Sequence, residues 1–423
     1  MSPPRVIIAG AGLAGLSAAV VLADAGVAVS LSDSANQPGG RCRSYHDAGL
    51  GLTIDNGNHL VLSGNPAVAD YRRTIGANEP MAGPDHADFA FADLSSGNRW
   101  TVRINDGRLP WWIASPSRRV PGTSLSDYLP LARLLHGANA PIGEVISTSG
   151  PLWERFLAPL LLAALNTAPE QASAALAGQV LRETLARGGR AMRPRIAQPT
   201  LGAAFIDPAL AWLAKRGCHL ATGRRLRALQ FAGDRVTALE WSDGPERLGV
   251  EDSVILAVPA WTARDLVPGL TVPTEHRAIV NGHFAFTAAA SVPPMLGLLG
   301  GTAEWIFTHP DRISVTVSAA DRLVDRDRED LAQTFWADIR AALGIAAPLP
   351  AWQIVKEKRA TFAATPEQDA MRPGQRTRWR NLFLAGDWVQ NGLPATIEGA
   401  LRTGDNAARL ALGRPLVYEA PRC

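Results

Sequence analysis

Cysteine is scarce in this chain of 423 residues. The three cysteines, Cys42, Cys218 and Cys423, cannot all pair, and no C-x-x-C spacing marks a metal site or a redox motif. Such usage suits a reducing compartment better than a disulfide-stabilised secreted fold. We therefore expect the protein in the cytoplasm.

The chain also lacks a surplus of charge of either sign. It has 42 Lys and Arg against 39 Asp and Glu, a formal net charge of +3, and its basic residues are scattered. Nucleic-acid binding depends on clustered positive charge. The sequence therefore offers no reason to expect a nucleic-acid partner.

Two uncharged stretches pass a crude test for a membrane span, but neither has a suitable composition. Residues Val6–Ala23 carry regularly spaced glycines, and residues Phe284–Ala303 contain Pro293, Pro294 and several glycines. Proline and glycine at these positions suit strands, turns and loops better than a helix exposed to lipid. We expect both stretches inside folded domains.

Several catalytic motifs are absent as well. The chain has no H-E-x-x-H or cysteine cluster for a metal, no G-x-S-x-G turn for a nucleophilic serine and no G-x-x-x-x-G-K-[ST] loop. No second G-x-G-x-x-G marks a separate nicotinamide domain. We expect no metal site, and the electron donor stays unassigned.

The N-terminus has a pattern typical of a βαβ unit. Residues Arg5–Ala9 and Val27–Leu31 are apolar, and residues Leu13–Ala25 between them are rich in Ala and Leu at helical spacing. Further along, residues Leu152–Ala164 predict a buried helix, and residues Arg328–Leu343 predict an amphipathic one. Residues Thr396–Leu412 predict a long terminal helix.

Glycines at the first turn of this unit indicate a dinucleotide site. They form G-x-G-x-x-G between strand and helix, where a tight turn lets backbone amides and the helix N-terminus approach a pyrophosphate. An acidic residue ends the second strand, where a ribose hydroxyl needs an acceptor. A purely structural glycine turn is the alternative. The expected contacts here are Gly10, Gly12, Leu13, Ala14, Gly15 and Asp33.

The segment "QPGGRCRS" follows that acidic residue by a few positions. In this segment the chain resembles the FAD-dependent amine-oxidase and phytoene-desaturase superfamily. The resemblance implies that Gly39, Gly40 and Arg41 lie against the flavin and the pyrophosphate. A surface turn with one solvated arginine is the alternative for the tripeptide alone.

A second stretch, "LFLAGDWVQNGLPATIEGALRTG", resembles the other flavin motif of that superfamily. The resemblance implies that Asp387, after Gly386, accepts a hydrogen bond from the ribityl chain. It also implies a helix N-terminus whose amides stabilise negative charge on the reduced flavin. The residues expected there are Thr396, Ile397, Glu398 and Ala400. Leu226, before a predicted meander, is expected to meet the adenine through its backbone.

These segments predict an α/β fold with two domains, since one core rarely extends over so long a chain. A discontinuous, Rossmann-like FAD-binding domain comprises residues 1–70, 200–262 and 375–423. An α+β substrate-binding domain comprises residues 71–199 and 263–374.

Other stretches narrow the resemblance. Amine oxidases of the superfamily frame the amine with aromatic residues, whereas Gly392, Leu393 and Pro394 occupy the corresponding place here. An aliphatic residue suits a hydrocarbon better than an ammonium group. The stretches "IDNGNHLVL" and "LNTAPEQAS" are similar to those of hydroxysqualene dehydroxylases, also called squalene-associated FAD-dependent desaturases, of bacterial hopanoid biosynthesis.

This resemblance implies that the enzyme reduces hydroxysqualene to squalene. On this hypothesis the hydroxyl leaves as water and reduced FAD delivers hydride from N5 to the allylic carbon. A desaturase or oxidase acting on squalene, a carotenoid precursor or an amine is the alternative, because one fold serves both directions. A flavin-bound chaperone or assembly subunit is a rival from another class.

His59 and Asn166 are the candidate catalytic residues. A histidine can donate a proton near neutral pH, although an isolated histidine is more often structural. Asn166, Thr167 and Glu170 surround a helix break, where they are either pocket residues or helix caps. Asp55 and Asn56 are expected to fix the loop before His59 through hydrogen bonds from their side chains to the backbone. For His59 the catalytic and the structural role both stay open, and for the residues at the helix break the pocket and the capping role both stay open.

A hydrophobic triterpene substrate would have to come from the bilayer. Trp111, Trp112 and Ile113 beside Arg118 and Arg119 suggest a peripheral anchor on the inner face of the membrane. A place in the core or the pocket wall is an equal alternative for these residues.

Overall fold

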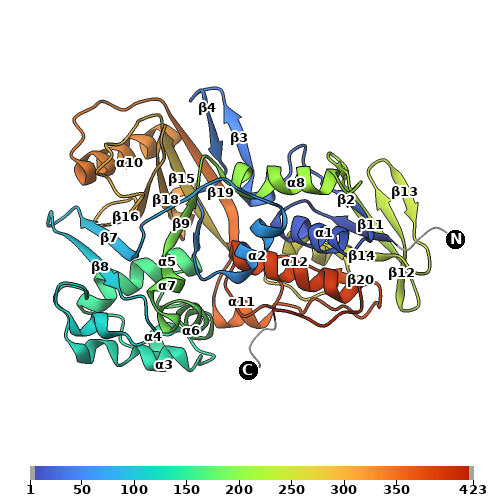
Figure 1. Cartoon of the computed structure of the whole chain (residues 1–423), viewed down its shortest axis with the longest axis horizontal. Helices are drawn as coiled ribbons and strands as arrows, with labels where there is room; N and C mark the ends of the chain where they lie inside the picture. The colour runs from blue at the N-terminus through green and yellow to red at the C-terminus, as the bar shows by residue number, and fades with distance from the viewer. Residues whose placement is uncertain (1–4, 419–423) are drawn as a thin grey trace.

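The computed structural model describes residues 5–418, so Cys423 lies outside the described residues. Two sheet-centred domains lie side by side, each assembled from separated parts of the chain (Figure 1). The N-terminal strands and the last helix share the domain on the right of Figure 1, and the middle of the chain builds the domain on the left.

The first domain is built on a parallel five-stranded sheet. Its strands in spatial order are β10 (Leu220–Ala221), β2 (Ala28–Ser32), β1 (Arg5–Ala9), β14 (Ser253–Leu256) and β20 (Leu382–Leu384). In the central strand, Ile7 and Ile8 point to opposite faces and enter different hydrophobic cores. Such double burial explains why β1 is a continuous apolar run.

The two ends of the chain meet in a close helix pair. Helices α1 (Leu13–Asp24) and α12 (Ile397–Ala411) pack against each other, and Ser17 Oγ donates to the carbonyl of Leu401 at 2.9 Å. A β-carbon on Gly404 would lie 2.1 Å from the carbonyl oxygen of Ala14. Glycine at this position therefore permits the helices to approach closely, which places both N-termini in one domain.

Smaller elements complete this domain and its border. They are α2 (Pro66–Thr74), α8 (Asp207–Ala214), α9 (Ala260–Leu266), the meander β11 (Leu226–Ala232), β12 (Arg235–Trp241) and β13 (Gly244–Arg247), the hairpin β3 (Ser44–Asp47) and β4 (Leu52–Asp55), and the sheet of β5 (Leu60–Leu62), β9 (Pro194–Ala197) and β6 (Met81–Ala82). The predicted domain boundary at residue 70 falls within α2, a helix that packs on α12.

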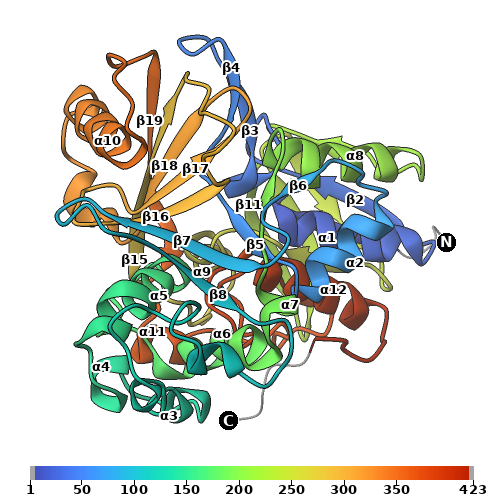
Figure 2. The same ribbon diagram turned by 60° about the vertical axis from the view of Figure 1, so that its left-hand side comes forward.

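The second domain is built on a mixed seven-stranded sheet. Its strands in spatial order are β19 (Trp352–Phe362), β15 (His276–Phe284), β18 (Ile313–Val317), β17 (Trp305–Thr308), β16 (Met295–Leu299), β7 (Ala87–Asp93) and β8 (Arg99–Ile104). Helix α10 (Arg328–Leu343) covers one face (Figure 2). Short helices gather beyond β7 and β8: α3 (Leu131–Leu135), α4 (Ile142–Val145), α5 (Ala158–Leu165), α6 (Ala174–Glu183), α7 (Gly189–Met192) and α11 (Pro366–Ala370).

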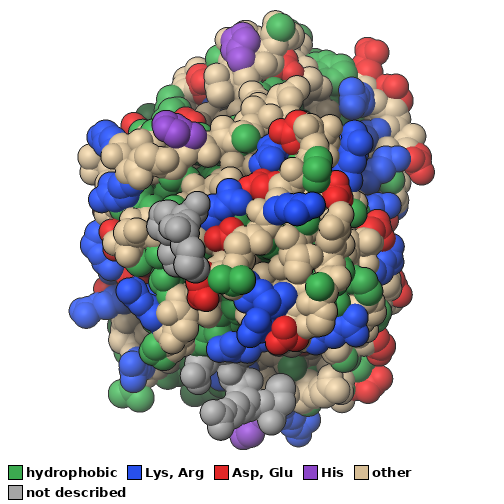
Figure 3. Space-filling model, turned by 90° about the vertical axis from the view of Figure 1, so that its right-hand side faces the viewer, with side chains coloured by type: hydrophobic (Ala, Val, Ile, Leu, Met, Phe, Trp, Pro, Cys, Tyr) green, Lys and Arg blue, Asp and Glu red, His purple; other side chains and the backbone are tan. Residues whose placement is uncertain are grey.

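Several predicted elements are confirmed. β1 and α10 have the predicted bounds, α1 ends one residue earlier than predicted, and α12 is one residue shorter at each end. The predicted helix Leu152–Ala164 is helical throughout, with a π-helical segment over Trp153–Leu157 that continues into α5. No helix within residues 5–418 combines the length and the apolar character needed to cross a membrane. On the face in Figure 3, basic and acidic side chains are interspersed.

Candidate functional site

One cavity of about 850 Å³ is lined by both domains. The first domain contributes the first turns of α1 and α12, and the second contributes one face of the seven-stranded sheet. Its volume is in the range of sites that enclose organic ligands. The predicted cofactor residues, apart from Gly15, lie on the wall of this cavity.

The three glycines of the first motif have different roles. A β-carbon on Gly10 would lie 2.3 Å from the carbonyl oxygen of Ala257, and one on Gly15 would lie 1.8 Å from that of Gly10. These two positions need glycine because protein backbone fills the adjacent space. A β-carbon on Gly12 would meet no atom within 4 Å, because that space belongs to the cavity. Gly12 thus leaves room for a ligand at the N-terminus of α1.

The first turn of α1 is prepared for an anion. Gly12 caps the helix without a side-chain hydrogen bond, and Leu13 and Ala14 line the cavity. The first amides of a helix have no intrahelical acceptor, and the helix dipole favours negative charge beside them. Phosphate oxygens of a dinucleotide fit this arrangement.

Asp33 lies at the predicted place after β2. Its carboxylate accepts hydrogen bonds from the amides of Ala11 at 2.6 Å and Ala35 at 2.8 Å, and it lines the cavity. A carboxylate has about four acceptor sites, so two backbone donors leave capacity for hydroxyl groups. This capacity fits a ribose.

The second glycine pair lies directly against the first motif. The amide of Gly39 donates to the carbonyl of Ala11 at 2.8 Å, and Gly12 and Gly39 form a parallel β-bridge. Gly39 and Gly40 have φ angles of +101° and +56°, which favour glycine. The alternative of a surface turn is therefore wrong, since both residues line the cavity.

Arg41 and Asp387 form an ion pair inside the site. Arg41 Nη2 lies 2.6 Å from Asp387 Oδ1, and Arg41 Nη1 also donates to the carbonyl of Ala360. Gly386, which precedes the acidic residue, has its amide bound to Thr403 Oγ1 at 2.9 Å. The pair joins the two flavin motifs to strand β19, and sequence reasoning did not anticipate it.

The first turn of α12 is partly self-capped. Thr396 Oγ1 accepts from the amide of Gly399 at 3.0 Å, and the Thr396 carbonyl accepts from the amide of Ala400 at 3.0 Å. The side chain of Thr396 is therefore a helix cap. The preceding amides, those of Ile397 and Glu398, are the ones that remain available to an acceptor in the cavity.

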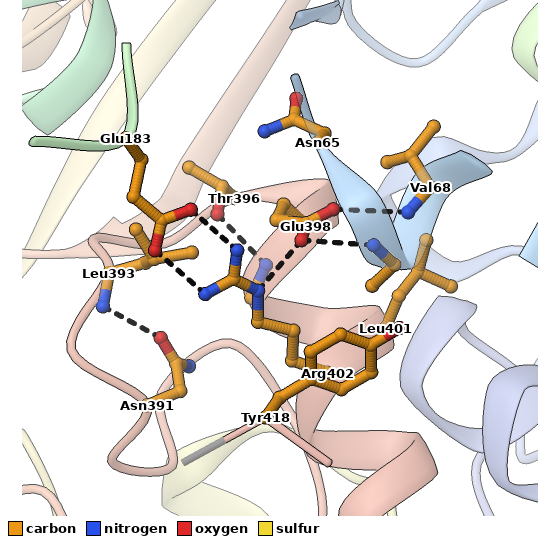
Figure 4. Close-up of polar contacts among 12 residues, drawn as sticks. Asn65, Val68, Glu183, Asn391, Leu393, Thr396, Glu398, Leu401, Arg402 and Tyr418 are labelled. Carbon is orange, nitrogen blue, oxygen red and sulfur yellow. Dashed lines mark hydrogen bonds and ion pairs between the residues drawn. The ribbon is translucent and has the colours of Figure 1, made fainter. Parts of the chain in front are cut away.

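The side chain of Glu398 turns away from this role (Figure 4). Its carboxylate accepts from the amides of Ala67 and Val68 at 3.1 and 3.0 Å and so caps α2. Arg402 lies between two carboxylates: its Nε is 2.7 Å from Glu398 Oε1, and its Nη2 is 2.6 Å from Oε2 of Glu183 in α6. Glu398 can contribute to the cofactor site only through its backbone.

Burial and pairing shift the titration of these two carboxyl groups in opposite directions. Burial raises the pKa of Glu398, with Arg402 acting against it. Burial also acts to raise the pKa of Glu183, but the hydrogen bonds and charge of Arg402 hold this pKa below its ordinary value. The cluster thus links α12, α2 and α6 by buried charge.

Leu226 lies at the start of β11 and lines the cavity beside Trp241, its cross-strand partner. Arg224 also lines this part of the cavity, and its guanidinium lies 4.3 Å from the ring centre of Trp241. Arg224 is held by Asp243 and Glu246 at 2.9 and 3.1 Å. Sequence reasoning missed Arg224 and Trp241, because neither belongs to a motif.

His59 lines the cavity, but its titration differs from expectation. Burial and the positive charge of Arg41 lower the pKa of His59 to about 4. The lowered pKa favours the neutral imidazole at pH 7, which still carries one N–H donor, so the catalytic role of His59 stays a prediction. A buried ring next to a guanidinium resists protonation for elementary electrostatic reasons.

Asn166 lines the cavity but also ties several elements together. It ends α5 with φ of +48°, its Nδ2 donates to Thr361 Oγ1 at 2.9 Å, and its Oδ1 accepts from the amide of Ala319 at 2.7 Å. These bonds supply a structural reason for an asparagine there. Thr167 is fully buried and accepts from the amide of Ala364, and Glu170 is exposed, so neither is a pocket residue.

Asp55 and Asn56 brace the approach to His59. Asp55 Oδ1 accepts from the amide of Leu201 at 2.9 Å, and Asn56 Nδ2 donates to Glu357 Oε2 at 3.2 Å. The bracing role predicted for them is confirmed for Asp55, whose partner is a backbone amide. Asn56 binds a side chain of β19 instead.

The predicted Trp anchor divides into two different environments. Trp112 is 3% exposed and packs edge-on against Tyr128 and Phe156, so it belongs to the core. Trp111 is 55% exposed, with the guanidinium of Arg118 over its ring at 4.7 Å. A role for Trp112 in membrane contact is therefore wrong, while Trp111 remains available.

Within residues 5–418, no group of three or more His, Cys, Asp or Glu side chains is arranged to hold a metal ion. The polar groups that the cavity offers are the amides of glycine-rich turns and helix N-termini, and the ion pair of Arg41 with the buried Asp387. Taken together, they fit a dinucleotide with an attached ring system.

Comparisons with known proteins agree with this geometry. The model of the flavin containing amine oxidoreductase family matches residues 13–412. A hydroxysqualene dehydroxylase of Rhodopseudomonas palustris is 53% identical over 409 residues, which cover 96% of this chain and 98% of the relative. Another from Sinorhizobium fredii is 50% identical, with 97% and 99% covered. A putative protoporphyrinogen oxidase structure from Exiguobacterium sp. superposes with a TM-score of 0.68 at 17% identity, covering 98% of this chain and all of that one.

Proposed function

The chain belongs to the flavin containing amine oxidoreductase family and, within it, to the hydroxysqualene dehydroxylases, and we propose that it reduces hydroxysqualene to squalene. It is an FAD-dependent oxidoreductase. The observation that carries the proposal is the cavity between the domains, which combines a dinucleotide site with apolar side chains of the seven-stranded sheet.

The residues of the first domain fit FAD. The N-terminus of α1 at Gly12 would hold the pyrophosphate, Asp33 a ribose, and Arg41 with Asp387 the polar chain that leads to the flavin. The free amides at the start of α12 would stabilise negative charge on the ring. Reduced FAD supplies the hydride of the reaction.

The second domain supplies an apolar enclosure for the substrate. Side chains from three neighbouring strands, β7, β16 and β17, line it: Phe89, Met295, Trp305 and Phe307. Leu393 and Pro394 also lie on the cavity wall, where an amine oxidase would need aromatic rings around an ammonium group. Such walls bind a triterpene chain and exclude water from the reacting carbon, which favours the hydrocarbon alternative over an amine.

A direct assay tests the proposal. Purified protein, reduced without oxygen, is incubated with hydroxysqualene, and the extract is analysed by mass spectrometry. We expect squalene to form in proportion to the flavin oxidised. No squalene from protein with bound, reducible flavin would contradict the proposal. A parallel incubation of oxidised protein with squalene tests the desaturase alternative, for which the flavin would instead become reduced.

We also propose that the protein touches the membrane that holds its substrate. Two short helical turns, Trp111–Ala114 and Leu125–Tyr128, lie side by side because the rings of Trp112 and Tyr128 pack against each other. Four large apolar side chains in or beside these turns are exposed: Leu109 (81%), Trp111 (55%), Leu125 (52%) and Leu129 (73%). Large exposed apolar side chains near Arg118 fit the interface of a bilayer with anionic headgroups.

A further inference from the structure

The cavity face of the seven-stranded sheet is divided into a polar and an apolar half. Successive side chains of a strand alternate between faces, and directly paired residues share a face. The register pairs Thr316 of β18 with Asn281 of β15 on one side and Trp305 of β17 on the other. From Thr316 toward β15 and β19 most residues of the cavity wall are polar, with Ile279, Ala360 and Phe362 as exceptions, and from Trp305 toward β7 the wall is apolar.

Three side chains form a hydrogen-bonded cluster in the polar half. Thr316 Oγ1 donates to Asn281 Oδ1 at 2.8 Å, and Asn58 Nδ2 lies 3.0 Å from Thr316 Oγ1 and 3.4 Å from Asn281 Oδ1. The backbone amide of Asn58 also donates to Asn281 Oδ1, at 3.3 Å. We call Asn58, Asn281 and Thr316 the amide cluster. Its members come from the loop after β4 and from two adjacent strands.

The amide cluster has hydrogen-bonding groups to spare. Asn281 is 1% exposed, and its Nδ2 donates to no acceptor among residues 5–418. Asn58 Oδ1 is buried and has no partner among the same residues. Buried polar atoms are nearly always paired in folded proteins. Asn281 Nδ2 is thus a donor without a protein acceptor beside the cavity, and the oxygen of a hydroxyl group can accept from it.

The absence of a side chain at Gly57 leaves the amide nitrogen of Asn281 accessible to a ligand. A β-carbon at Gly57 would lie 3.1 Å from Asn281 Nδ2, so a side chain there would crowd the unpaired donor. The charged groups nearby have other partners: Glu357 accepts from Asn56, and Arg41 pairs with Asp387. The hydrogen-bonding groups of the amide cluster itself are amides and a hydroxyl, all neutral, which favours an alcohol over a carboxylate or an ammonium group.

We propose that the amide cluster is an alcohol-binding subsite, which holds the hydroxyl oxygen of the substrate while the hydrocarbon chain lies along the apolar half of the sheet. This inference rests on the proposed function and names the residues that recognise the reacting group. Squalene lacks the oxygen and leaves the cluster unpaired, so the site distinguishes substrate from product. The cost of unpaired buried polar groups corresponds to roughly a 10- to 100-fold preference for the alcohol.

The test compares binding of the alcohol and the hydrocarbon to oxidised, FAD-loaded protein, in which the alcohol is not reduced. Dissociation constants for hydroxysqualene and squalene are measured from the change in flavin absorbance. We expect Asn281→Leu and Thr316→Val to weaken hydroxysqualene binding about 10-fold or more and to leave squalene binding within about 3-fold.

Thr308→Val is the matched control, because Thr308 lies on the neighbouring strand β17 and its hydroxyl binds the carbonyl of Pro293 outside the cavity. Thr316→Val conserves shape, so it serves if Asn281→Leu does not fold. Variants that keep the wild-type ratio of the two constants overturn the subsite. Wild-type protein that forms no squalene overturns the proposed function, and the ratio of constants then still decides whether the cluster binds the alcohol.

Discussion

Arg41 and Asp387 are 346 positions apart in the chain, yet their side chains form an ion pair of 2.6 Å in the wall of the cavity. Each belongs to one of the two motifs that indicated FAD. Asp387 is buried, and a buried carboxylate that loses its cationic partner destabilises the fold around it. The pair therefore connects cofactor binding to the assembly of the first domain.

Removing either member of this pair should weaken FAD binding. We expect Arg41→Met and Asp387→Asn each to raise the FAD dissociation constant by roughly 10- to 100-fold, since a charge-assisted hydrogen bond is lost. The double variant should lose less than the sum of both changes, because the two side chains share one interaction. Titration of apoprotein with FAD measures all three. Strictly additive effects would show that the pair is not coupled.

Gly12 should tolerate a side chain in the fold but not in the cofactor site. We expect the free energy of unfolding of the Gly12→Val apoprotein to lie within about 1 kcal/mol of the wild-type value, because the new atoms enter open space. The same variant should lose the yellow flavin spectrum, because this space is where the cofactor binds. Gly374→Val is the control, since a β-carbon there also meets no atom within 4 Å and Gly374 lies outside the cavity. Full flavin occupancy in Gly12→Val would contradict the proposed pyrophosphate site at the N-terminus of α1.

Arg402 should be important for stability because it neutralises two carboxylates. Arg402→Met leaves Glu183 and Glu398 uncompensated, and we expect a loss of about 3–5 kcal/mol in urea unfolding at pH 8. The exposed pair of Arg326 and Asp330 provides the control, and Arg326→Met should cost less than about 1 kcal/mol.

The pH dependence of the Arg402→Met variant follows from burial. Burial already raises the pKa of Glu398, and without Arg402 the strongest influences that lower the pKa of Glu183 are lost, which leaves burial opposed only by Gln179 and Arg187. Both groups then bind protons more tightly in the folded than in the unfolded state, so the deficit should shrink as the pH falls from 8 to 5. A deficit that stays constant over this range would rule out uncompensated charge as its cause.

Two buried histidines should make the protein sensitive to acid. Burial lowers the pKa of His283 and of His309 to about 3, so both rings stay neutral in the folded protein while they take up protons in the unfolded chain. Their contribution is present above pH 6.5 and is lost as the pH falls toward the folded pKa, by up to ~1.4 kcal/mol per pH unit for each ring.

Buried Asp55 and Glu304 have raised pKa values, so their effect on stability has the opposite pH dependence. They are present in wild type and in the histidine variants alike, and the difference between variant and wild type therefore isolates the histidines. We expect His283→Gln and His309→Gln to unfold with a shallower loss of stability than wild type between pH 6 and pH 4.5. The exposed His86 is the control, and His86→Gln should follow the wild-type curve. Parallel curves for all four proteins would contradict the neutral buried rings.

Membrane contact should depend on Trp111 and not on Trp112. We expect Trp111→Ser with Leu129→Ser to reduce flotation with anionic liposomes several-fold, since exposed apolar area is lost. Val250→Ser removes an equally exposed apolar residue from the other domain and should have no effect. Trp112→Ala is unsuitable, because loss of a core tryptophan costs about 3–5 kcal/mol of stability. Unchanged flotation would contradict the proposed contact.

Local patterns predicted the secondary structure near the motifs well. β1 and α10 have the predicted bounds, because an apolar β-branched run and an amphipathic repeat are decided by neighbouring residues. The lowered pKa of His59 was not predictable in this way, since its burial and its contact with the guanidinium of Arg41 arise only in the fold.

The amide cluster illustrates the same limit. The alternation Ile-Ser-Val-Thr-Val over Ile313–Val317 is visible in the sequence and indicates a strand with one polar face. Nothing in the pattern tells that Asn58 and Asn281 lie beside Thr316, because their contact depends on the register of β15 with β18.

The sequence by itself determined the cofactor and the family. Glycine spacing, an acidic strand end and a C-terminal motif act through backbone geometry that short segments encode. The tertiary structure decided what surrounds these motifs: the partner of Arg41, the neutral state of His59, the burial of Trp112 and the polar half of the sheet. Each of these depends on long-range packing, where burial and distant charges, rather than neighbouring residues, set the energy of a side chain.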